Sequence, residues 1–435
     1  MKTLYYFFLL FFSKFFYKVI KFFKISEGTS VIGLIILKIN KNFIKQSTKY
    51  INHVVTVTGT NGKTTTSSLI SHILKRNKYK IISNTEGANM ITGIANAFAV
   101  KIFPFKNYDY AILESDEAYL TKLYDELNSD YLVVTNLFRD QLDRYGELNT
   151  TAQKIQNAID KNPKLKLILN ADDPLVANLK SKNEIIYYGI NKIKYNYTDS
   201  ISKSPQDFIN CPVCRKELKY SKKFYAHEGH YYCTCGYKHP VCKYTADIFV
   251  NEDFSTIKLF VNDKSYYLQT KLKGLYNVYN VLASVVLCFE LGITNFQNAL
   301  DDYTPEFGRN EIRNIKGKQA TIHLIKNPTG ASEVLRTILP ESSILIAIND
   351  DYADGRDVSW LWDSDFEELK KCKKEIVVSG KRAKDMAIRL KYAEIKNYVV
   401  IPDIDKAIKH ISKNTDDKIT ILATYTALLY LNKYK

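Results

Sequence analysis

The sequence predicts an α/β protein of two consecutive domains, each built around a mainly parallel sheet. Its 435 residues exceed one ordinary domain and favour two or three. The stretch 53–58 is short and β-branched, and it leads through a glycine-containing loop into a helix-compatible stretch at 65–74. From about residue 312 onward, apolar strands alternate with helical stretches, which is typical of a doubly wound, Rossmann-like sheet.

These patterns divide the chain into three parts. We expect a basic and aromatic helical segment at 1–50, a central domain at 51–305 and a C-terminal domain at 306–435. A cysteine-rich insert at about 207–243 interrupts the central domain. Hydrophobic residues make up 46% and charged residues 25% of the chain, which excludes a largely disordered or fibrous protein.

The charge is unevenly distributed. A formal net charge of +16 indicates an anionic partner, such as a nucleic acid, a nucleotide or a membrane surface. Residues 1–50 hold nine Lys, no Arg and one acid, so this segment carries +8 of the excess. A general nucleic-acid-binding surface would more often spread such charge along the fold, and we therefore expect no nucleic-acid partner.

The first helix combines apolar and basic residues. Its apolar run at 4–12 is shorter than the roughly 20 residues of a membrane span, and no signal-peptide cleavage pattern follows it. Lys14, Lys18 and Lys21 share one helical face, and phenylalanines cover the rest. We expect a helix lying on a membrane surface. Packing on its own domain or on a partner is the alternative. The phenylalanines are Phe11, Phe12, Phe15, Phe16, Phe22 and Phe23.

The loop after the 53–58 strand predicts a phosphate site. Backbone N–H groups and the helix dipole favour an anion there, Lys63 can reach β- and γ-phosphates, and Thr64 can hold Mg²⁺. Val57 stands where the usual eight-residue pattern has glycine, so TGTNGKTT is a narrower signature. The predicted ATP-binding residues are Gly59, Thr60, Asn61, Gly62, Lys63, Thr64 and Thr65.

This loop resembles that of the Mur ligase superfamily, ATP-dependent ligases that join an amino group to a carboxylate through an acyl phosphate. Further segments match in the family's order: LESDE around Glu114, TN…D at 135–143, NADD at 170–173, GxxNxxN at 274–280 and FGR at 307–309. The resemblance implies catalytic roles for Lys63 and Glu114, and Mg²⁺ on Thr64 and Glu114. It also implies an adenine contact at Asn280 and an ATP-phosphate contact at Arg309.

Two positions depart from the family pattern. Gln141 and Tyr276 stand where the family usually has His, and the first of these leaves binding of a second metal open. Lys154 lies near the place of a lysine that several members carbamylate, and this modification is also left open.

The cysteine insert predicts a zinc ribbon. Five of the seven cysteines lie between Cys211 and Cys242, which is unlike a disulfide scaffold. A C-x₂-C pair and a C-x-C pair predict a structural zinc on Cys211, Cys214, Cys233 and Cys235. Because C-x-C strains its turn, a neighbour could replace one ligand. The candidates are His227, His230, His239 and Cys242.

A charged loop follows the second strand expected in the C-terminal domain. It contains Asp354, Asp357 and both tryptophans of the chain, a poor composition for a core, and we expect it to be functional. Together with the insert it resembles the MurT branch of the superfamily, the ligase subunits of lipid II isoglutaminyl synthases. The 58 residues before Gly59 are also too few for the UDP-binding domain of other Mur ligases.

The branch implies a glutamine-dependent amidation in peptidoglycan synthesis. ATP would activate the α-carboxylate of D-glutamate in lipid II, and ammonia would convert it to D-isoglutamine. A GatD-like class-I glutaminase, the other half of a heterodimer, would release that ammonia, and Asp354 or Asp357 would complete its Cys/His pair. The enzyme would work in the cytoplasm, at the inner face of the cytoplasmic membrane. The alternatives are a folylpolyglutamate- or cyanophycin-type ligase and a nucleic-acid-binding zinc-ribbon NTPase.

Overall fold

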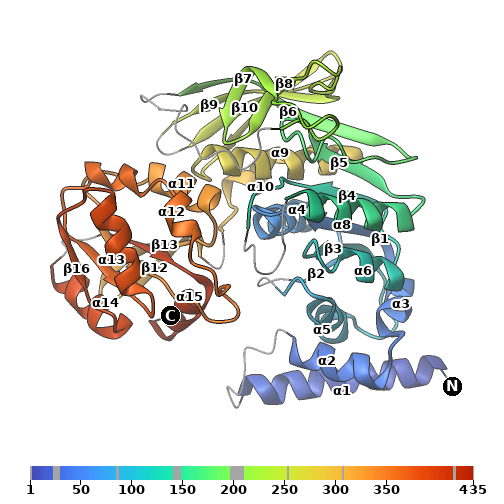
Figure 1. Ribbon diagram of the computed structural model, residues 1–435. Coiled ribbons are helices and arrows are strands. Elements are labelled where there is room, and N and C mark those ends of the chain that lie inside the picture. Colours follow the sequence, from blue (N-terminus) through green and yellow to red (C-terminus); the bar gives the residue numbers. More distant parts are fainter. Residues whose placement is uncertain are drawn as a thin grey trace.

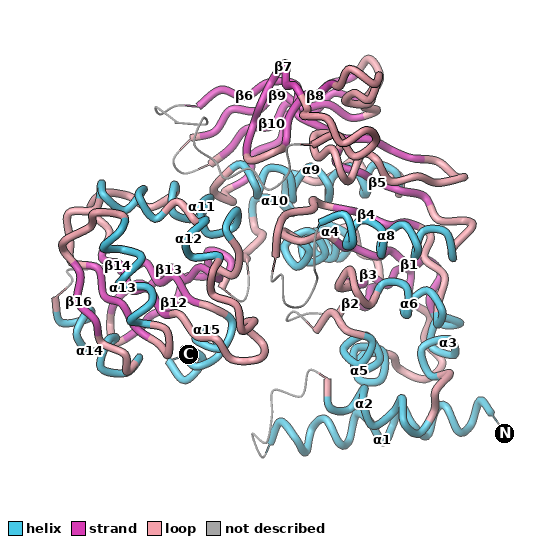
Figure 2. The backbone as a smooth tube through the Cα atoms, in the orientation of Figure 1, coloured by secondary structure: helices cyan, strands magenta, loops and turns pink. Residues whose placement is uncertain are grey.

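The computed structural model describes residues 2–22, 30–84, 88–140, 148–195, 210–251, 254–305, 308–414 and 418–434. Within them lie a nine-stranded sheet, a six-stranded sheet and a two-stranded hairpin (Figure 1). Helices surround both large sheets, and the hairpin packs beside the central sheet, next to β6, β9 and β10 (Figure 2). The expected α/β fold class is confirmed.

The nine-stranded sheet of the central domain is parallel from β2 to β9 and antiparallel at one edge. Its spatial order is β11-β10-β9-β6-β5-β4-β1-β3-β2. Sequence patterns located its first strands closely but missed the antiparallel edge. The strands are β1 (Ile51–Thr58), β2 (Ile81–Ser83), β3 (Tyr108–Glu114), β4 (Tyr131–Val134), β5 (Lys166–Asn170), β6 (Ile185–Tyr195), β9 (Tyr244–Val250), β10 (Ser255–Val261) and β11 (Lys264–Thr270).

Both faces of this sheet are covered by helices. Val55 and Val57 of β1 enter one core, and Val54 enters the other, because neighbouring side chains of a strand point to opposite faces. The first face carries α4 (Lys63–Arg76), α9 (Leu275–Glu290) and α10 (Gln297–Asp301). The second carries α5 (Ile91–Lys101), α6 (Leu120–Glu126) and α8 (Leu148–Lys161).

The N-terminal segment packs on this second face. Gly33 of α2 approaches α5 so closely that a β-carbon there would lie 1.8 Å from the Thr92 carbonyl oxygen. Helix α1 buries Tyr6, Leu9 and Leu10 in the same core. One face of α1 therefore packs on its own domain, which is the alternative interpretation of this helix. The segment contains α1 (Lys2–Phe22), α2 (Val31–Ile39), α3 (Phe43–Ser47) and the short 3₁₀ helix η1 (Thr48–Tyr50).

The C-terminal domain is a doubly wound sheet in the order β12-β13-β17-β14-β15-β16, parallel except for β12. Strand β12 begins at Arg309, the last residue of the FGR segment. The strands are β12 (Arg309–Ile315), β13 (Lys318–Leu324), β14 (Ser343–Ala347), β15 (Ile376–Ser379), β16 (Tyr398–Val400) and β17 (Lys418–Ala423). The helices are α11 (Pro328–Arg336), α12 (Trp360–Asp363), η3 (Phe366–Lys371), α13 (Ala383–Tyr392), α14 (Ile404–Lys413), α15 (Tyr425–Tyr430) and η4 (Leu431–Tyr434).

The cysteine insert forms the two-stranded hairpin between β6 and β9. Its strands are β7 (Lys219–Tyr225) and β8 (Glu228–Tyr232). The hairpin lies at the top of Figure 1, near α9 and the carboxyl end of β5.

Candidate active site

The phosphate loop connects β1 to α4. Gly59 and Gly62 have positive φ angles of 124° and 84°, and a β-carbon at Gly62 would lie 2.0 Å from Asn280 Oδ1. Glycine is therefore required at position 62 by both conformation and space. The segment that follows the neighbouring strand β4 supports the loop, because Thr60 N donates to the Asn136 carbonyl oxygen and Asn61 N donates to Asn136 Oδ1, each at 2.9 Å.

Lys63 is the first residue of α4 and is buried. Its Nζ lies 3.1 Å from Glu117 Oε1 and also donates to the carbonyl oxygens of Gly59 and Thr60. Burial by itself lowers the pKa of Lys63, but the carboxylates of Glu117, Asp116 and Glu114 raise it above the ordinary value. Lys63 therefore stays positively charged beside the loop.

The loop also has the donor atoms of a Mg²⁺ site. Glu114 ends β3 and is 2% exposed, and its Oε1 accepts a hydrogen bond from Asn89 Nδ2. Among the described residues, Glu114 Oε2 and Thr64 Oγ1 are buried with no hydrogen-bond partner. An unpartnered carboxylate oxygen and an unpartnered hydroxyl oxygen, both lining one cavity, fit a hard divalent cation.

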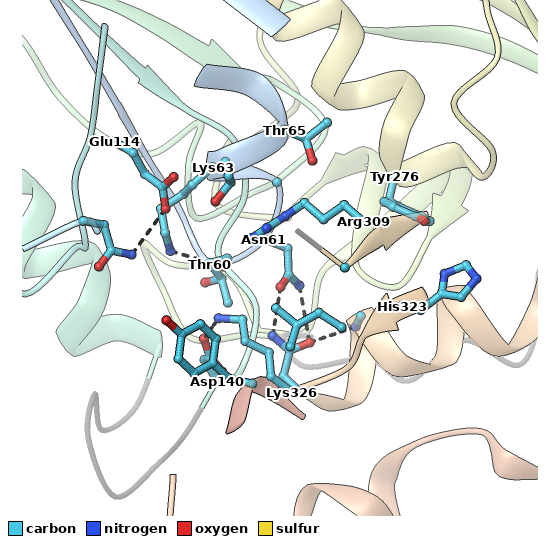
Figure 3. Close-up of a pocket in the computed structure, with 18 of the residues that line it drawn as sticks. Thr60, Asn61, Lys63, Thr65, Glu114, Asp140, Tyr276, Arg309, His323 and Lys326 are labelled. Carbon is cyan, nitrogen blue, oxygen red and sulfur yellow. Dashed lines mark hydrogen bonds and ion pairs between the residues drawn. The ribbon is translucent and has the colours of Figure 1, made fainter. Parts of the chain in front are cut away.

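The two domains enclose this cavity of about 410 Å³. Asn327 Nδ2 of the C-terminal domain donates to Asn61 Oδ1 at 2.9 Å, and Lys326 forms an ion pair with Asp140. Arg309 points into the cavity from β12 (Figure 3). The structure therefore brings the sequence-predicted residues 60–65, Glu114, Asn280 and Arg309 around one space, and Gly59 lies just outside its lining. Gln141 lies outside the described residues.

Two aromatic rings lie at the other end of the cavity. Tyr276 and His323 lie there, away from Glu114 and Asp140 (Figure 3). Burial lowers the pKa of His323 to about 4, so its imidazole is neutral at pH 7. Asn280 is buried at the phosphate-loop side, where Thr66 Oγ1 donates to its Oδ1 at 3.4 Å.

Sequence reasoning did not assign several residues to this site, among them Glu117, His323, Lys326 and Tyr225. The acidic stretch LESDE matches a family segment, but the pairing of its Glu117 with Lys63, like that of Lys326 with Asp140, depends on contacts between distant segments. His323 sits in an ordinary apolar strand pattern and had no local signal.

The four predicted zinc ligands come together. Cys211 Sγ lies 3.7 Å from Cys235 Sγ, Cys214 Sγ lies 3.4 Å from Cys233 Sγ, and all four sulfur atoms lie within 4.8 Å of one another. Tetrahedral Zn²⁺ with Zn–S bonds of about 2.3 Å needs sulfur atoms about 3.8 Å apart. Gly236, with φ of 91° and no neighbouring atom near its missing β-carbon, allows the tight C-x-C turn.

The residues considered as substitute zinc ligands make contacts elsewhere. His239 Nε2 is 2.8 Å from Asp172 Oδ1, and His230 Nε2 is 2.8 Å from the Ile190 carbonyl oxygen. His227 is buried with its Nε2 3.5 Å from Asp173 Oδ2. Cys242 Sγ is 3.8 Å from the Pro240 carbonyl oxygen. The geometry therefore favours the four cysteines over a substituted set.

The charged loop after β14 presents its two candidate aspartates differently. Asp354 is buried and lines the cavity, and it accepts hydrogen bonds from Thr426 N at 2.7 Å and Asp351 N at 3.0 Å. Asp357 is partly exposed, and its Oδ1 accepts a hydrogen bond from Ser359 N at 2.8 Å. Asp354 therefore joins the loop to α15, while Asp357 lies nearer to solvent.

Helix α1 exposes a stripe of large apolar side chains opposite its buried face: Leu4, Phe8, Phe11, Phe15 and Phe22. Lys18 is exposed beside them. Lys14, expected on the same outer face, is instead turned inward. Its Nζ donates to the Val100 carbonyl oxygen at 2.8 Å and lies over the Phe103 ring. Within the described part of the chain, none of the helices has both the length and the apolar character needed to cross a bilayer.

Comparison with known proteins agrees with this architecture. The family model "Mur ligase middle domain" matches residues 57–221, and "MurT ligase C-terminal" matches residues 324–428. Among solved structures, a pseudomurein peptide ligase type C from Methanothermus fervidus has a TM-score of 0.69 at 23% identity, covering 88% of this chain and 79% of that one. MurF ligase from Thermotoga maritima has a TM-score of 0.64 at 14% identity, covering 92% and 83%. These likenesses show the Mur ligase fold.

Curated relatives cover nearly the whole chain. "Lipid II isoglutaminyl synthase (glutamine-hydrolyzing) subunit MurT" of Staphylococcus aureus (strain COL) is 37% identical over 412 residues, 92% of this chain and 91% of the relative. The protein of the same name from Streptococcus pneumoniae (strain ATCC BAA-255 / R6) is 35% identical over 415 residues, 93% and 92% of the two chains. With the structure and both family models in agreement, this chain belongs to the MurT family of Mur-type ligase subunits.

Proposed function

We propose that the chain is the ligase subunit of a glutamine-hydrolysing lipid II isoglutaminyl synthase. It would use ATP to amidate the α-carboxylate of D-glutamate in the lipid II stem peptide, yielding D-isoglutamine for peptidoglycan. The observation that carries this proposal is the cavity in which the phosphate loop, Glu114 and a MurT-type C-terminal domain meet. The alternative Mur-type ligases and the nucleic-acid-binding NTPase are not favoured by the relatives.

The chemistry follows from the charges around the cavity. The substrate carboxylate oxygen attacks the γ-phosphorus of ATP and ADP leaves, giving an acyl phosphate. Ammonia then attacks the acyl carbon, a proton is lost and phosphate departs with the carboxyl oxygen. Lys63 and Arg309 stabilise the negative charge that moves toward ADP, because both are cations that line the cavity. Mg²⁺, held by Thr64 and Glu114, would add charge neutralisation at the phosphates.

The closed arrangement of the domains supports the same chemistry. The Asn61–Asn327 contact and the Lys326–Asp140 ion pair hold the C-terminal domain over the phosphate loop. Excluding water there protects an acyl phosphate from hydrolysis. These contacts join residues on opposite sides of the cavity, and they would have to break for nucleotide exchange.

Ammonia would come from a partner subunit. Cys288 is fully buried in α9, where burial raises the pKa of its thiol, and Cys372 is partly buried with a raised pKa for the same reason. A thiol with a raised pKa is a poor nucleophile at neutral pH. We therefore assign glutamine hydrolysis to a GatD-like class-I glutaminase in a heterodimer with this chain.

The proposal is tested by co-expressing the chain with a neighbouring glutaminase reading frame. We expect the two chains to co-purify and to convert lipid II, in the presence of ATP and glutamine, to a product with the mass of the amide. ADP should be released in step with amidation, and only when lipid II is present. ADP release that depends on DNA or RNA, or on addition of an amino acid in place of ammonia, would overturn this assignment.

Because Asp354 is buried and Asp357 is partly exposed, we expect their replacement to affect the complex differently. Asp357→Asn should impair amidation driven by glutamine and leave amidation driven by free ammonium nearly intact, because the partly exposed carboxylate can reach a partner. Asp354→Asn should impair both, because Asp354 holds the loop to Thr426 at the cavity wall. Initial rates with each nitrogen source measure this. If free ammonium restores amidation in Asp354→Asn and not in Asp357→Asn, Asp354 is the residue that completes the glutaminase site. If ammonium restores amidation in neither variant, neither aspartate has that role.

We propose that Zn²⁺ occupies the four-cysteine cluster and stabilises the insert. Elemental analysis of the purified chain should find about one zinc per chain, since the four cysteine sulfur atoms would share one tetrahedral ion. Cys211→Ser should lose this zinc. Cys242→Ser is the matched control, because Cys242 lies in the same insert but outside the cluster, and it should retain the metal. Equal zinc in both variants would contradict the assignment.

We propose that α1 rests on the inner face of the cytoplasmic membrane, where a lipid-linked substrate is held. Its exposed apolar stripe and Lys18 suit an interface with anionic headgroups. Replacing Phe8, Phe11 and Phe15 together by Ser should reduce co-sedimentation with vesicles containing phosphatidylglycerol. Tyr267→Ser, an exposed aromatic residue of β11, is the control. Unchanged sedimentation of the triple variant would exclude this surface.

A further inference from the structure

The cysteine insert reaches the nucleotide cavity. Tyr225 is the last residue of β7, is 3% exposed and lines the same cavity as Lys63, Asn280 and Arg309. The phosphate loop and the hairpin are separated by more than half of the central domain in sequence. The tertiary fold therefore brings them together, and the insert forms part of the cavity wall.

Aromatic contacts connect the tip of the hairpin to the phosphate loop. The ring centroids of Tyr225 and Phe138 are 5.3 Å apart, and those of Phe138 and His227 are 4.7 Å apart. Phe138 N donates to Thr60 Oγ1, which in turn donates to the Phe138 carbonyl oxygen, both at 3.1 Å. The hairpin tip thus packs directly on the residue that holds Thr60 of the loop.

Tyr225 also faces helix α9. Its ring centroid lies 6.3 Å from that of Tyr279, the residue before Asn280. The Tyr279 hydroxyl donates to Asp172 Oδ2 at 2.9 Å, which fixes this ring. Tyr225 therefore lies between Phe138, which supports the phosphate loop, and α9, the helix that carries Asn280.

Buried polar contacts hold the tip in this position. Gly229 N donates to the Asp172 carbonyl oxygen at 2.9 Å, and Asn170 Nδ2 donates to Glu228 Oε1 at 3.0 Å. Asp173 Oδ2 accepts from Leu137 N at 2.7 Å. Since the hairpin and residue 137 both contact the 170–173 turn, a shift of the hairpin would disturb the segment behind the phosphate loop.

The cysteines lie at the opposite end of the hairpin. Cys211 and Cys214 precede β7, and Cys233 and Cys235 follow β8. A two-stranded hairpin is at best marginally stable alone, and a metal at its base supplies folding energy. A metal bound there would therefore help to keep the tip in place.

We propose that the insert is a component of the nucleotide site. Tyr225 contacts the bound purine nucleoside triphosphate, and the metal-held hairpin supports the phosphate loop through Phe138. This inference rests on the ATP site of the proposed function and adds to it a binding residue outside the phosphate-loop and α9 motifs. It also makes zinc a determinant of nucleotide affinity, although the cysteines themselves are not among the residues lining the cavity.

Calorimetric titration of the full chain with Mg²⁺ and a non-hydrolysable ATP analogue tests this inference without partner or lipid II. Tyr225→Ala should weaken binding about tenfold, the order expected for loss of one aromatic contact with a nucleotide. Tyr225→Phe, which keeps the ring, should bind nearly as the unaltered chain does. Tyr232→Ala is the matched control, because Tyr232 is an exposed aromatic residue of the same hairpin.

Two further measurements complete the test. Phe138→Leu should also weaken binding, which keeps the inference testable if Tyr225→Ala fails to fold. Removing the metal with a chelator should lower nucleotide affinity while circular dichroism shows the main sheets retained. Unchanged affinity in the folded Tyr225→Ala and Phe138→Leu variants would overturn the inference alone. Failure of the unaltered chain to bind the analogue would overturn the proposed ATP site and this inference with it.

Discussion

Replacing Lys63 by alanine is expected to abolish ATP-dependent amidation, with a loss of about a thousandfold or more. Lys63 begins α4 beside the loop that would hold the phosphates, and the surrounding carboxylates keep it protonated. Without it, a buried cluster of acidic groups would face the triphosphate with less compensating charge. ADP release and the mass of lipid II, measured with the purified heterodimer, report the effect.

The interpretation of this variant needs control of stability. Removing Lys63 leaves Glu117 buried without its ion-pair partner, which is itself destabilising. The double variant Lys63→Ala/Glu117→Gln removes that uncompensated charge and should recover thermal stability without recovering activity. Lys75→Ala, at an exposed position of the same helix, should behave as the unaltered chain. Substantial amidation by a folded Lys63→Ala variant would refute the assignment of the ATP site.

Replacing Glu114 by glutamine is expected to lower amidation by about a hundredfold or more. Glutamine has the shape of glutamate and can still accept the hydrogen bond from Asn89, but it lacks the charge that binds a divalent cation. The loss should be accompanied by a higher Mg²⁺ concentration for half-maximal rate. Rates measured across a Mg²⁺ series separate this effect from a loss of folding.

The matched control for Glu114 is Asp125→Asn. Asp125 is an exposed acid of the same domain that pairs with Lys161 at the surface, and its replacement should change neither the rate nor the Mg²⁺ dependence. A Glu114→Gln variant with normal rate and normal Mg²⁺ dependence would exclude Glu114 as a metal ligand.

Local sequence patterns predicted the phosphate loop well. The β-branched stretch at 53–58, the glycines and the following helix are contiguous, so each residue's place follows from its neighbours in the chain. The same holds for the four cysteines, whose spacing indicates a shared ion and whose sulfur atoms do lie together. The alternation of strands and helices expected from about residue 312 is present in the C-terminal sheet for the same reason.

The first helix shows where such patterns are insufficient. Apolar residues surround α1, so its periodicity does not tell which face is buried. Contacts with α2 and α5 decide this, placing Leu10 in the core and leaving Phe8 exposed. They also turn Lys14 inward, where burial lowers its pKa to about 8, although its spacing from Lys18 indicated a common outer face.

The sequence by itself determined the Mur-type loop, the α/β class, the cysteine cluster and the order of the two domains, because these depend on residues close together in the chain. The tertiary structure alone decided that Glu117 pairs with Lys63, that His323 and Lys326 reach the cavity from the second domain, and that Tyr225 enters its wall. The physical reason is that packing joins residues from distant segments. Nothing in the local spacing of a strand or hairpin specifies which distant surface its side chains will meet.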